Sequence, residues 1–245
     1  MKNIFKPAII PALTLISGAL GLGLQFWLLR TGVDEKGLLV QSHPAGTLLF
    51  ILTALVLAAL FLSSRNLPPM RQYSQLFPRG VLSSIGCVAA AAGILWVNVR
   101  ELTWQKDTIT LLTLILGLLA AFSLAMVAWK RKGCARPSCL FHALVTVYLM
   151  FHLVSQYRLW SSESQMLIYF FPLMASIFLM LSAYHSAVLD LRKESRSGFV
   201  FFSQAALFFC MVSIYSQSWL FYATMSLWLA TGLCSLQEEA PREEA

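Results

Sequence analysis

The sequence has little charge. Only 12% of its 245 residues are Asp, Glu, Lys or Arg, whereas soluble domains carry roughly 25%. Hydrophobic residues make up 58% of the chain, and the mean hydropathy is +0.70. A water-soluble core of this length does not need so much apolar surface, so the composition excludes a soluble globular domain. It predicts an all-α bundle of membrane-spanning helices.

The sequence also lacks the short motifs that mark common catalytic sites. It has no H-E-x-x-H zinc motif, no G-x-S-x-G nucleophile elbow, no glycine loop for phosphate and no paired carboxylates within an apolar segment. We therefore expect a protein that is not an enzyme and that holds no cofactor. The basic residues lie in short loops without a folded domain to present them, which argues against nucleic acid as a partner.

Eight apolar segments have about the 20 residues that a membrane-spanning helix needs. They are predicted at 9–29, 44–62, 80–98, 108–129, 138–156 and 165–189, with two more inside 198–236. An undivided helix over the last range would be about 58 Å long, roughly twice the hydrocarbon core, so we place a break at 215–218. The break has no Pro or Gly, and seven spans are therefore the alternative.

Basic residues alternate between the two sides of these segments. Of 18 Lys and Arg, 13 lie in the N-terminus, the second, fourth and sixth connections and the C-terminal tail. Cytoplasmic connections retain positive charge during insertion, so both termini are expected in the cytoplasm. The first partner is then the lipid bilayer, which we expect to be a bacterial plasma membrane. We expect charge only in loops and at helix ends, with none deep inside a span.

The chain is expected to form a single integral membrane domain over residues 1–245, with two halves of different composition. The half 1–129 is rich in Leu and small residues, which suits a scaffold of closely packed helices. The half 138–236 holds 11 of the 17 Phe, six of the seven Tyr and three of the four His. The acidic tail 237–245 is expected to be disordered and cytoplasmic.

Polar side chains recur at helical spacing in the second half. Such side chains commonly face a bundle interior or a water-filled cavity. They predict a cavity among spans five to eight that opens to the outside and suits a small, neutral or flat ligand. The alternative is that these groups join helices by hydrogen bonds. The candidate ligand-binding residues are His152, Gln156, Tyr169, Ser176, Gln204, Ser213 and Gln217.

A second, weaker hypothesis concerns metal. Cys134, Cys139 and His142 have C-x4-C-x2-H spacing, and His185 is expected at a similar depth on the next span. Four ligands of these types could enclose zinc. His142 with His185 could instead supply an axial pair to haem. The zinc spacing is not a specific signature, because loop cysteines near basic residues are commonly free thiols. For haem, nothing beyond the two histidines supports the site.

Two functions of different classes follow from these features. The first is a small-solute permease, or the membrane-embedded substrate-binding subunit of one, with its site in spans five to eight. The alternative is a non-catalytic scaffold that holds a membrane-protein partner, with small-residue faces of spans one and three as its interface. A haem- or metal-binding anchor is a minor alternative. The size of any polar cavity in the second half discriminates between the first two.

Overall fold

The computed structural model describes residues 9–32, 43–65, 80–104, 108–132, 138–161, 169–191 and 196–236. Within these ranges the regular elements are all helices. Seven are long and apolar enough to cross a membrane, and an eighth apolar helix has 16 residues. The expected helical membrane bundle of seven or eight spans is confirmed, and the chain is a multi-pass membrane protein.

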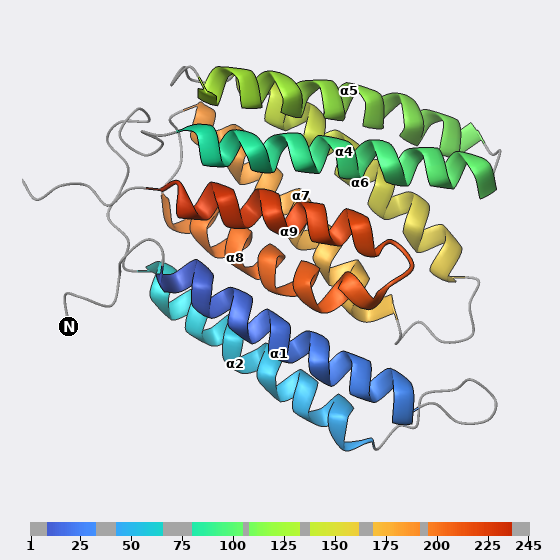
Figure 1. Cartoon of the computed structure of the whole chain (residues 1–245), viewed down its shortest axis with the longest axis vertical. Helices are drawn as coiled ribbons and strands as arrows, with labels where there is room; N and C mark the ends of the chain where they lie inside the picture. The colour runs from blue at the N-terminus through green and yellow to red at the C-terminus, as the bar shows by residue number, and fades with distance from the viewer. Residues whose placement is uncertain are drawn as a thin grey trace, which may run out of the picture.

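The helices begin close to the predicted positions and several continue further. They are α1 (Ile9–Thr31), α2 (Pro44–Arg65), α4 (Gly80–Trp104), α5 (Thr108–Lys132), α6 (Cys139–Ser161), α7 (Phe170–Asp190), α8 (Arg196–Val212), the 3-10 turn η2 (Ser213–Tyr215) and α9 (Trp219–Cys234). The expected disordered tail 237–245 lies outside the described residues. The first residues of α1 and the last of α9 lie at the same end of the bundle (Figure 1), which we name the inner end, and the opposite one the outer end.

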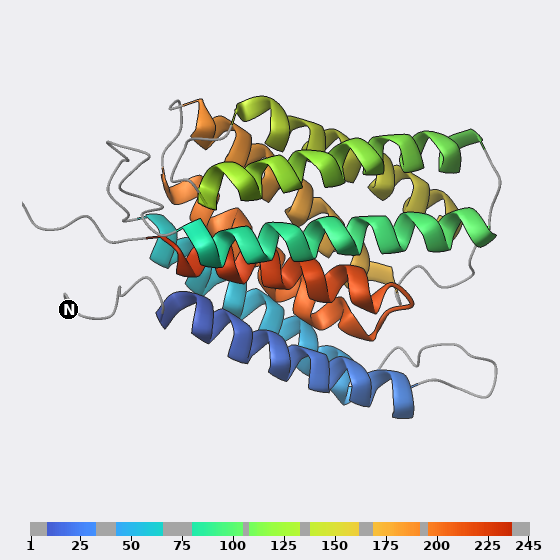
Figure 2. The same cartoon turned by 45° about the horizontal axis from the view of Figure 1, so that its top comes forward.

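Six of the helices form a closed ring. Each helix from α4 to α9 packs against the next in the chain, and α9 returns to pack against α4. The hairpin of α1 and α2 lies outside this ring and is attached to it mainly through α8. Figures 1 and 2 show the hairpin along one side of the bundle in both views. Helices that are not neighbours in the ring, such as α4 and α6, therefore meet only through side chains at its centre.

Small residues set how closely two pairs of helices approach. A Cβ atom added at Gly86 would lie 1.8 Å from Thr231 Oγ1, and one at Gly93 would lie 1.9 Å from Thr224 Oγ1. Both threonines belong to α9. On α1, Gly18 packs in the same way against Met211 of α8. The small-residue faces that we considered as a partner interface are therefore used within the chain, as contacts of α4 with α9 and of α1 with α8.

The break between the last two helices lies where the sequence predicts it. After η2, Ser216 adopts an extended conformation (φ −71°, ψ 167°), and its backbone N–H donates to Ser213 O at 2.9 Å. The chain then reverses into α9 at Trp219. From the neighbouring helix, Arg100 Nη1 donates to Gln217 O. This hydrogen bond links α4 to the turn, which contains no Pro or Gly.

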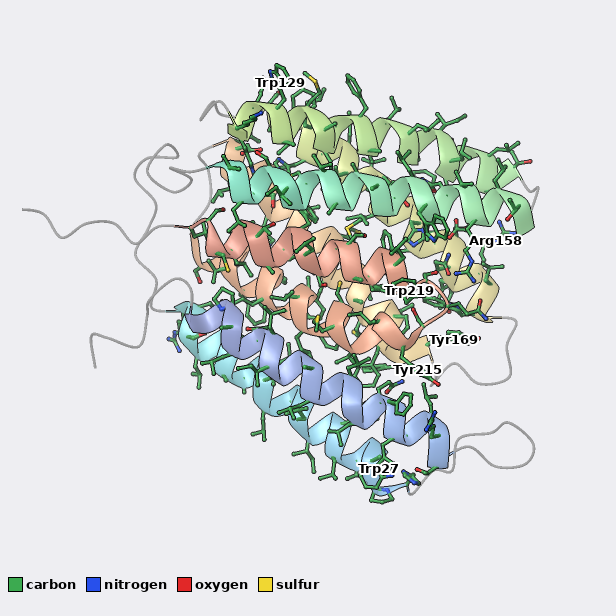
Figure 3. All side chains as sticks on the ribbon, viewed as in Figure 1. Trp27, Trp129, Arg158, Tyr169, Tyr215 and Trp219 are labelled. Atoms are coloured by element: carbon green, nitrogen blue, oxygen red, sulfur yellow. The ribbon has the colours of Figure 1, made fainter. Side chains whose placement is uncertain are left out.

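The lateral surface of the bundle, around the sides of the helices, is apolar and carries aromatic side chains near both ends. Leu55, Leu62 and Phe122 are each more than half exposed, as lipid contact requires. Figure 3 places Trp27 and Trp219 toward the outer end and Trp129 toward the inner end. Exposed Trp residues at the two levels of a bundle are typical of membrane interfaces.

Arg131, one of the basic residues that the sequence assigns to the fourth connection, is buried in the structure. Arg131 is 6% exposed and lies between α5 and α4. Its Nη1 donates a 2.5 Å hydrogen bond to Ser83 Oγ and lies 4.0 Å from Cys87 Sγ. Small side chains on α4 leave room for the guanidinium, so Arg131 joins two helices instead of meeting lipid headgroups.

Candidate functional site at the outer end of the ring

A cavity of about 660 Å³ opens at the outer end of the bundle. Its wall is built by the last turns of α1, α4, α6 and α8, the first turns of α5, α7 and α9, and the η2 turn with the residues that follow it. The expected cavity was confined to spans five to eight, whereas α1, α4 and α5 also contribute to this one. Its polar groups come mainly from Gln25, Arg100, Glu101, Gln156, Tyr169 and Gln217.

The candidate ligand-binding residues divide into two groups. Gln156, Tyr169, Ser213 and Gln217 line the cavity. The other three do not line it and are at most 1% exposed: His152, Ser176 and Gln204. Ligand binding by any of the seven stays a prediction.

The three residues away from the cavity have different surroundings. Ser176 Oγ donates to Pro172 O one turn earlier, at 3.0 Å, so it serves its own helix. Gln204 Oε1 is buried and has no hydrogen-bond partner among the described residues. His152 lies directly below the cavity, where its ring is 4.9 Å from that of Phe221 and 5.7 Å from that of Tyr148.

Glu101 is the central charged group of the cavity. Gln156 Nε2 donates a 2.5 Å hydrogen bond to Glu101 Oε1, and His152 Nδ1 lies 3.7 Å from the same oxygen. The glutamate side chain is 17% exposed and that of His152 is 1% exposed. The sequence places Glu101 in a loop, because the charges after Asn98 mark the end of an apolar segment. In the structure α4 continues to Trp104 and carries Glu101 toward the ring axis.

A column of polar atoms continues below Glu101 toward the middle of the bundle. Asn98 lies one turn earlier on α4, and Tyr148 lies one turn before His152 on α6. The amide of Asn98 and the hydroxyl of Tyr148 are both buried and lie next to each other. Asn98 fits there because a Cβ at Gly117 of α5 would lie 1.8 Å from its Nδ2 atom.

Aromatic side chains form part of the wall. Trp160 and Tyr169 stack with ring centroids 5.1 Å apart and planes 11° apart, which joins the end of α6 to the start of α7. Tyr169 is labelled near the outer end in Figure 3, on the same side as Arg158 and Tyr215. Flat rings of this kind offer apolar faces beside the polar groups of the cavity.

The metal and haem hypotheses involve residues at the inner end. Cys134 lies outside the described residues. His142 Nδ1 lies 2.7 Å from Asp190 Oδ2, and His185 stacks on Phe202 with ring centroids 4.5 Å apart. Within the described ranges, no group of three or more His, Cys, Asp or Glu side chains is arranged to hold a metal ion. The zinc and haem sites stay predictions.

The carboxylate at the inner end was not among the candidate residues. Asp190 is the last residue of α7, and its side chain is 1% exposed. With His142 of α6 it forms a buried pair between two neighbouring helices of the ring. The sequence predicts Asp190 as a charged residue at a helix end. Nothing in the spacing of His142 and Asp190 indicates that they meet.

Comparisons with protein-family profiles, with characterised proteins and with solved structures give no match.

Proposed function

We propose that the protein binds a small polar solute from the outer side of the membrane, as a permease or as the membrane-embedded substrate-binding subunit of one. The observation that carries this proposal is the cavity of about 660 Å³ lined by polar side chains at the outer end of the ring. Ligand sites commonly have volumes of roughly 300–1,000 Å³. A bundle that only held a partner would need no such cavity.

Unpaired polar atoms in the wall support a binding role. Gln25 Oε1, Ser213 Oγ and Ser216 Oγ are buried and have no hydrogen-bond partner among the described residues. A buried polar atom without a partner is unfavourable by about 1–3 kcal/mol, and a polar ligand can supply the missing bond. Gln25 belongs to α1, Ser213 to η2, and Ser216 directly follows η2, so one ligand would contact α1 and the turn together.

The charges of the wall indicate the kind of solute. Among the described lining residues, Arg100 is the one cation and Glu101 the one anion, which leaves the site without net charge. The amides of Gln25 and Gln156 and the rings of Trp160 and Tyr169 complete the lining. We therefore propose a neutral or zwitterionic solute with hydrogen-bonding groups and a flat face.

Thermal unfolding of the purified full-length protein in detergent tests the proposal. The probes are free amino acids, nucleosides and monosaccharides, and a compound at one hundred times its Kd should stabilise the protein by about 2.7 kcal/mol. In Gln156→Ala we expect at least about tenfold weaker binding of the compound, because it loses a hydrogen bond to the Gln156 amide, which lies beside the charged Glu101.

The control is Ser186→Ala, which removes a buried hydroxyl outside the cavity that donates to Ser182 O of its own helix. We expect it to bind the stabilising compound as the wild type does. Equal weakening in both variants would place the site elsewhere, and no stabilisation by any probe would count against solute binding. Uptake of the same compound into liposomes then distinguishes a permease from a binding subunit.

A further inference from the structure

The imidazole of His152 lies at the centre of the ring, beneath the cavity. It is 1% exposed, and its Nδ1 atom has no hydrogen-bond partner among the described residues. The nearest charged atom is Glu101 Oε1, at 3.7 Å. The two residues belong to α6 and α4, which α5 separates in the ring, so their side chains meet in its interior.

The surroundings of this pair hold few other charges. From α4, Arg100 is engaged with the carbonyl of Gln217. From α6, Tyr148 stacks on the imidazole and Gln156 donates to Glu101. From α9, Phe221 packs on the imidazole, and Tyr222 donates to Pro172 O of α7 at 3.4 Å. The described outer turns of α5, α7 and α9 carry no Asp, Glu, Lys or Arg.

We propose that Glu101 and His152 form a proton-binding site at the floor of the cavity, which couples proton binding to solute binding; the coupling rests on the proposed function. In the proton-free state the imidazole is neutral and does not balance the charge of the carboxylate 3.7 Å away. A proton taken from external water makes both ring nitrogens donors, so a positively charged ring then presents an Nδ1–H to Glu101 Oε1. The atoms then need to close by less than about 1 Å to form a charge-assisted hydrogen bond.

The partial exposure of Glu101 gives the sign of the coupling. Its carboxylate is 17% exposed, toward the cavity that the solute would fill. A bound neutral solute removes water from this carboxylate, and a dehydrated charge needs a compensating partner. A proton on His152 supplies that partner, so the proton and the solute favour each other's binding. Solute affinity should then rise as the pH falls.

Nuclear magnetic resonance of the full chain with 15N-labelled histidine rings, in detergent and without solute, tests the proton site. Ring nitrogens report protonation directly, and the His152 signal is identified by its absence in His152→Gln. In the wild type we expect this signal to change as the pH falls below about 6.5, the ordinary midpoint of an imidazole, because burial disfavours the charged ring. In Glu101→Gln we expect the change to be lost, because a buried imidazolium would have no opposite charge nearby.

Asp190→Asn is the control, because it removes a carboxylate from the other buried histidine, His142, and should leave the His152 signal unaffected. A His152 signal that does not change with pH in the wild type would overturn the proton site. An identical titration in Glu101→Gln would also overturn it, since Glu101 would then have no part in holding the proton.

The coupling is measured separately, with any amino acid, nucleoside or monosaccharide that stabilises the protein. Stabilisation should be larger at pH 5 than at pH 8 in the wild type and equal at both in Glu101→Gln. If no probe stabilises the protein but His152 titrates as expected, solute binding fails and the proton site stands. If a probe stabilises the protein and His152 does not titrate, only the proton site fails.

Discussion

Two pairs of a histidine and a carboxylate lie at opposite ends of α6. At the inner end, His142 and Asp190 are 2.7 Å apart, with side chains 0% and 1% exposed. At the outer end, His152 and Glu101 are 3.7 Å apart, with side chains 1% and 17% exposed. The chemical groups are nearly the same, but Glu101 of the outer pair lines the cavity at the outer end, whereas His142 and Asp190 do not line it.

The difference comes from which helices carry the partners. Asp190 is on α7, which packs directly against α6, so the inner pair closes between neighbouring backbones. Glu101 is on α4, which α5 separates from α6 in the ring, so this pair meets in the interior of the ring and not between packed backbones. A pair between neighbouring helices therefore joins them, whereas a pair in the ring interior leaves room for a ligand. Exposure and helix adjacency, more than residue type, separate a structural pair from a candidate functional one.

Breaking the inner pair should have the largest effect on stability. In Asp190→Ala, Nδ1 of His142 loses its carboxylate partner. Nε2 already has no partner among the described residues, so both buried ring nitrogens are then without a hydrogen bond. Each buried ring nitrogen left without a partner is unfavourable by about 1–3 kcal/mol. Chemical or thermal unfolding in detergent measures the loss. A loss below about 1 kcal/mol would mean that the inner pair does not join α6 to α7.

A double variant separates the pair from the packing around it. In His142→Leu with Asp190→Leu, no buried polar group is left without a partner. Apolar replacement of a buried ion pair is commonly neutral or stabilising, so most of the stability lost in Asp190→Ala should return. If the double variant is as unstable as the single one, the defect lies in side-chain volume, not in the pair.

The contact that holds α4 in place should be the next most sensitive. A Cβ atom at Gly93 would overlap Thr224 Oγ1 of α9, so Gly93→Ala should lower the free energy of unfolding by about 1–3 kcal/mol. The control Gly23→Ala meets no atom within 4 Å and should leave stability unchanged or slightly raised. Gly93→Ala together with Thr224→Ala should recover part of the loss. Equal effects at Gly93 and Gly23 would show that α4 does not depend on this contact.

The sequence predicts the parts of the fold that depend on apolar length and helical period. The spans follow from apolar segments, and the break before Trp219 follows from a segment too long for one helix. The helical spacing of His142, His152 and Gln156 predicts their shared face, and all three are buried. The glycines of α4 also predict that another helix packs closely against it, although the sequence does not identify α9 as that helix.

The order of the helices around the ring cannot be predicted from the sequence. Without it, Glu101 cannot be brought to His152, nor Asp190 to His142, because each pair is about 50 residues apart in the chain. A charged residue after an apolar segment predicts a helix end, so the local pattern predicts a loop at Glu101. Gln25 was assigned to a scaffold half, yet α1 brings it to the cavity wall. These contacts depend on tertiary packing, which local composition does not encode.

The smallest effect on stability is expected at the outer pair. In Glu101→Ala, His152 is left uncharged at neutral pH, and the amide of Gln156 can turn toward the cavity, so no buried charge loses its partner. A partly exposed pair contributes about 0–1 kcal/mol, and the free energy of unfolding should change by no more than that. Unfolding under the conditions used for Asp190→Ala makes the two losses comparable. A loss as large as that of Asp190→Ala would remove the distinction between the pairs, because Glu101 would then stabilise the ring as Asp190 does.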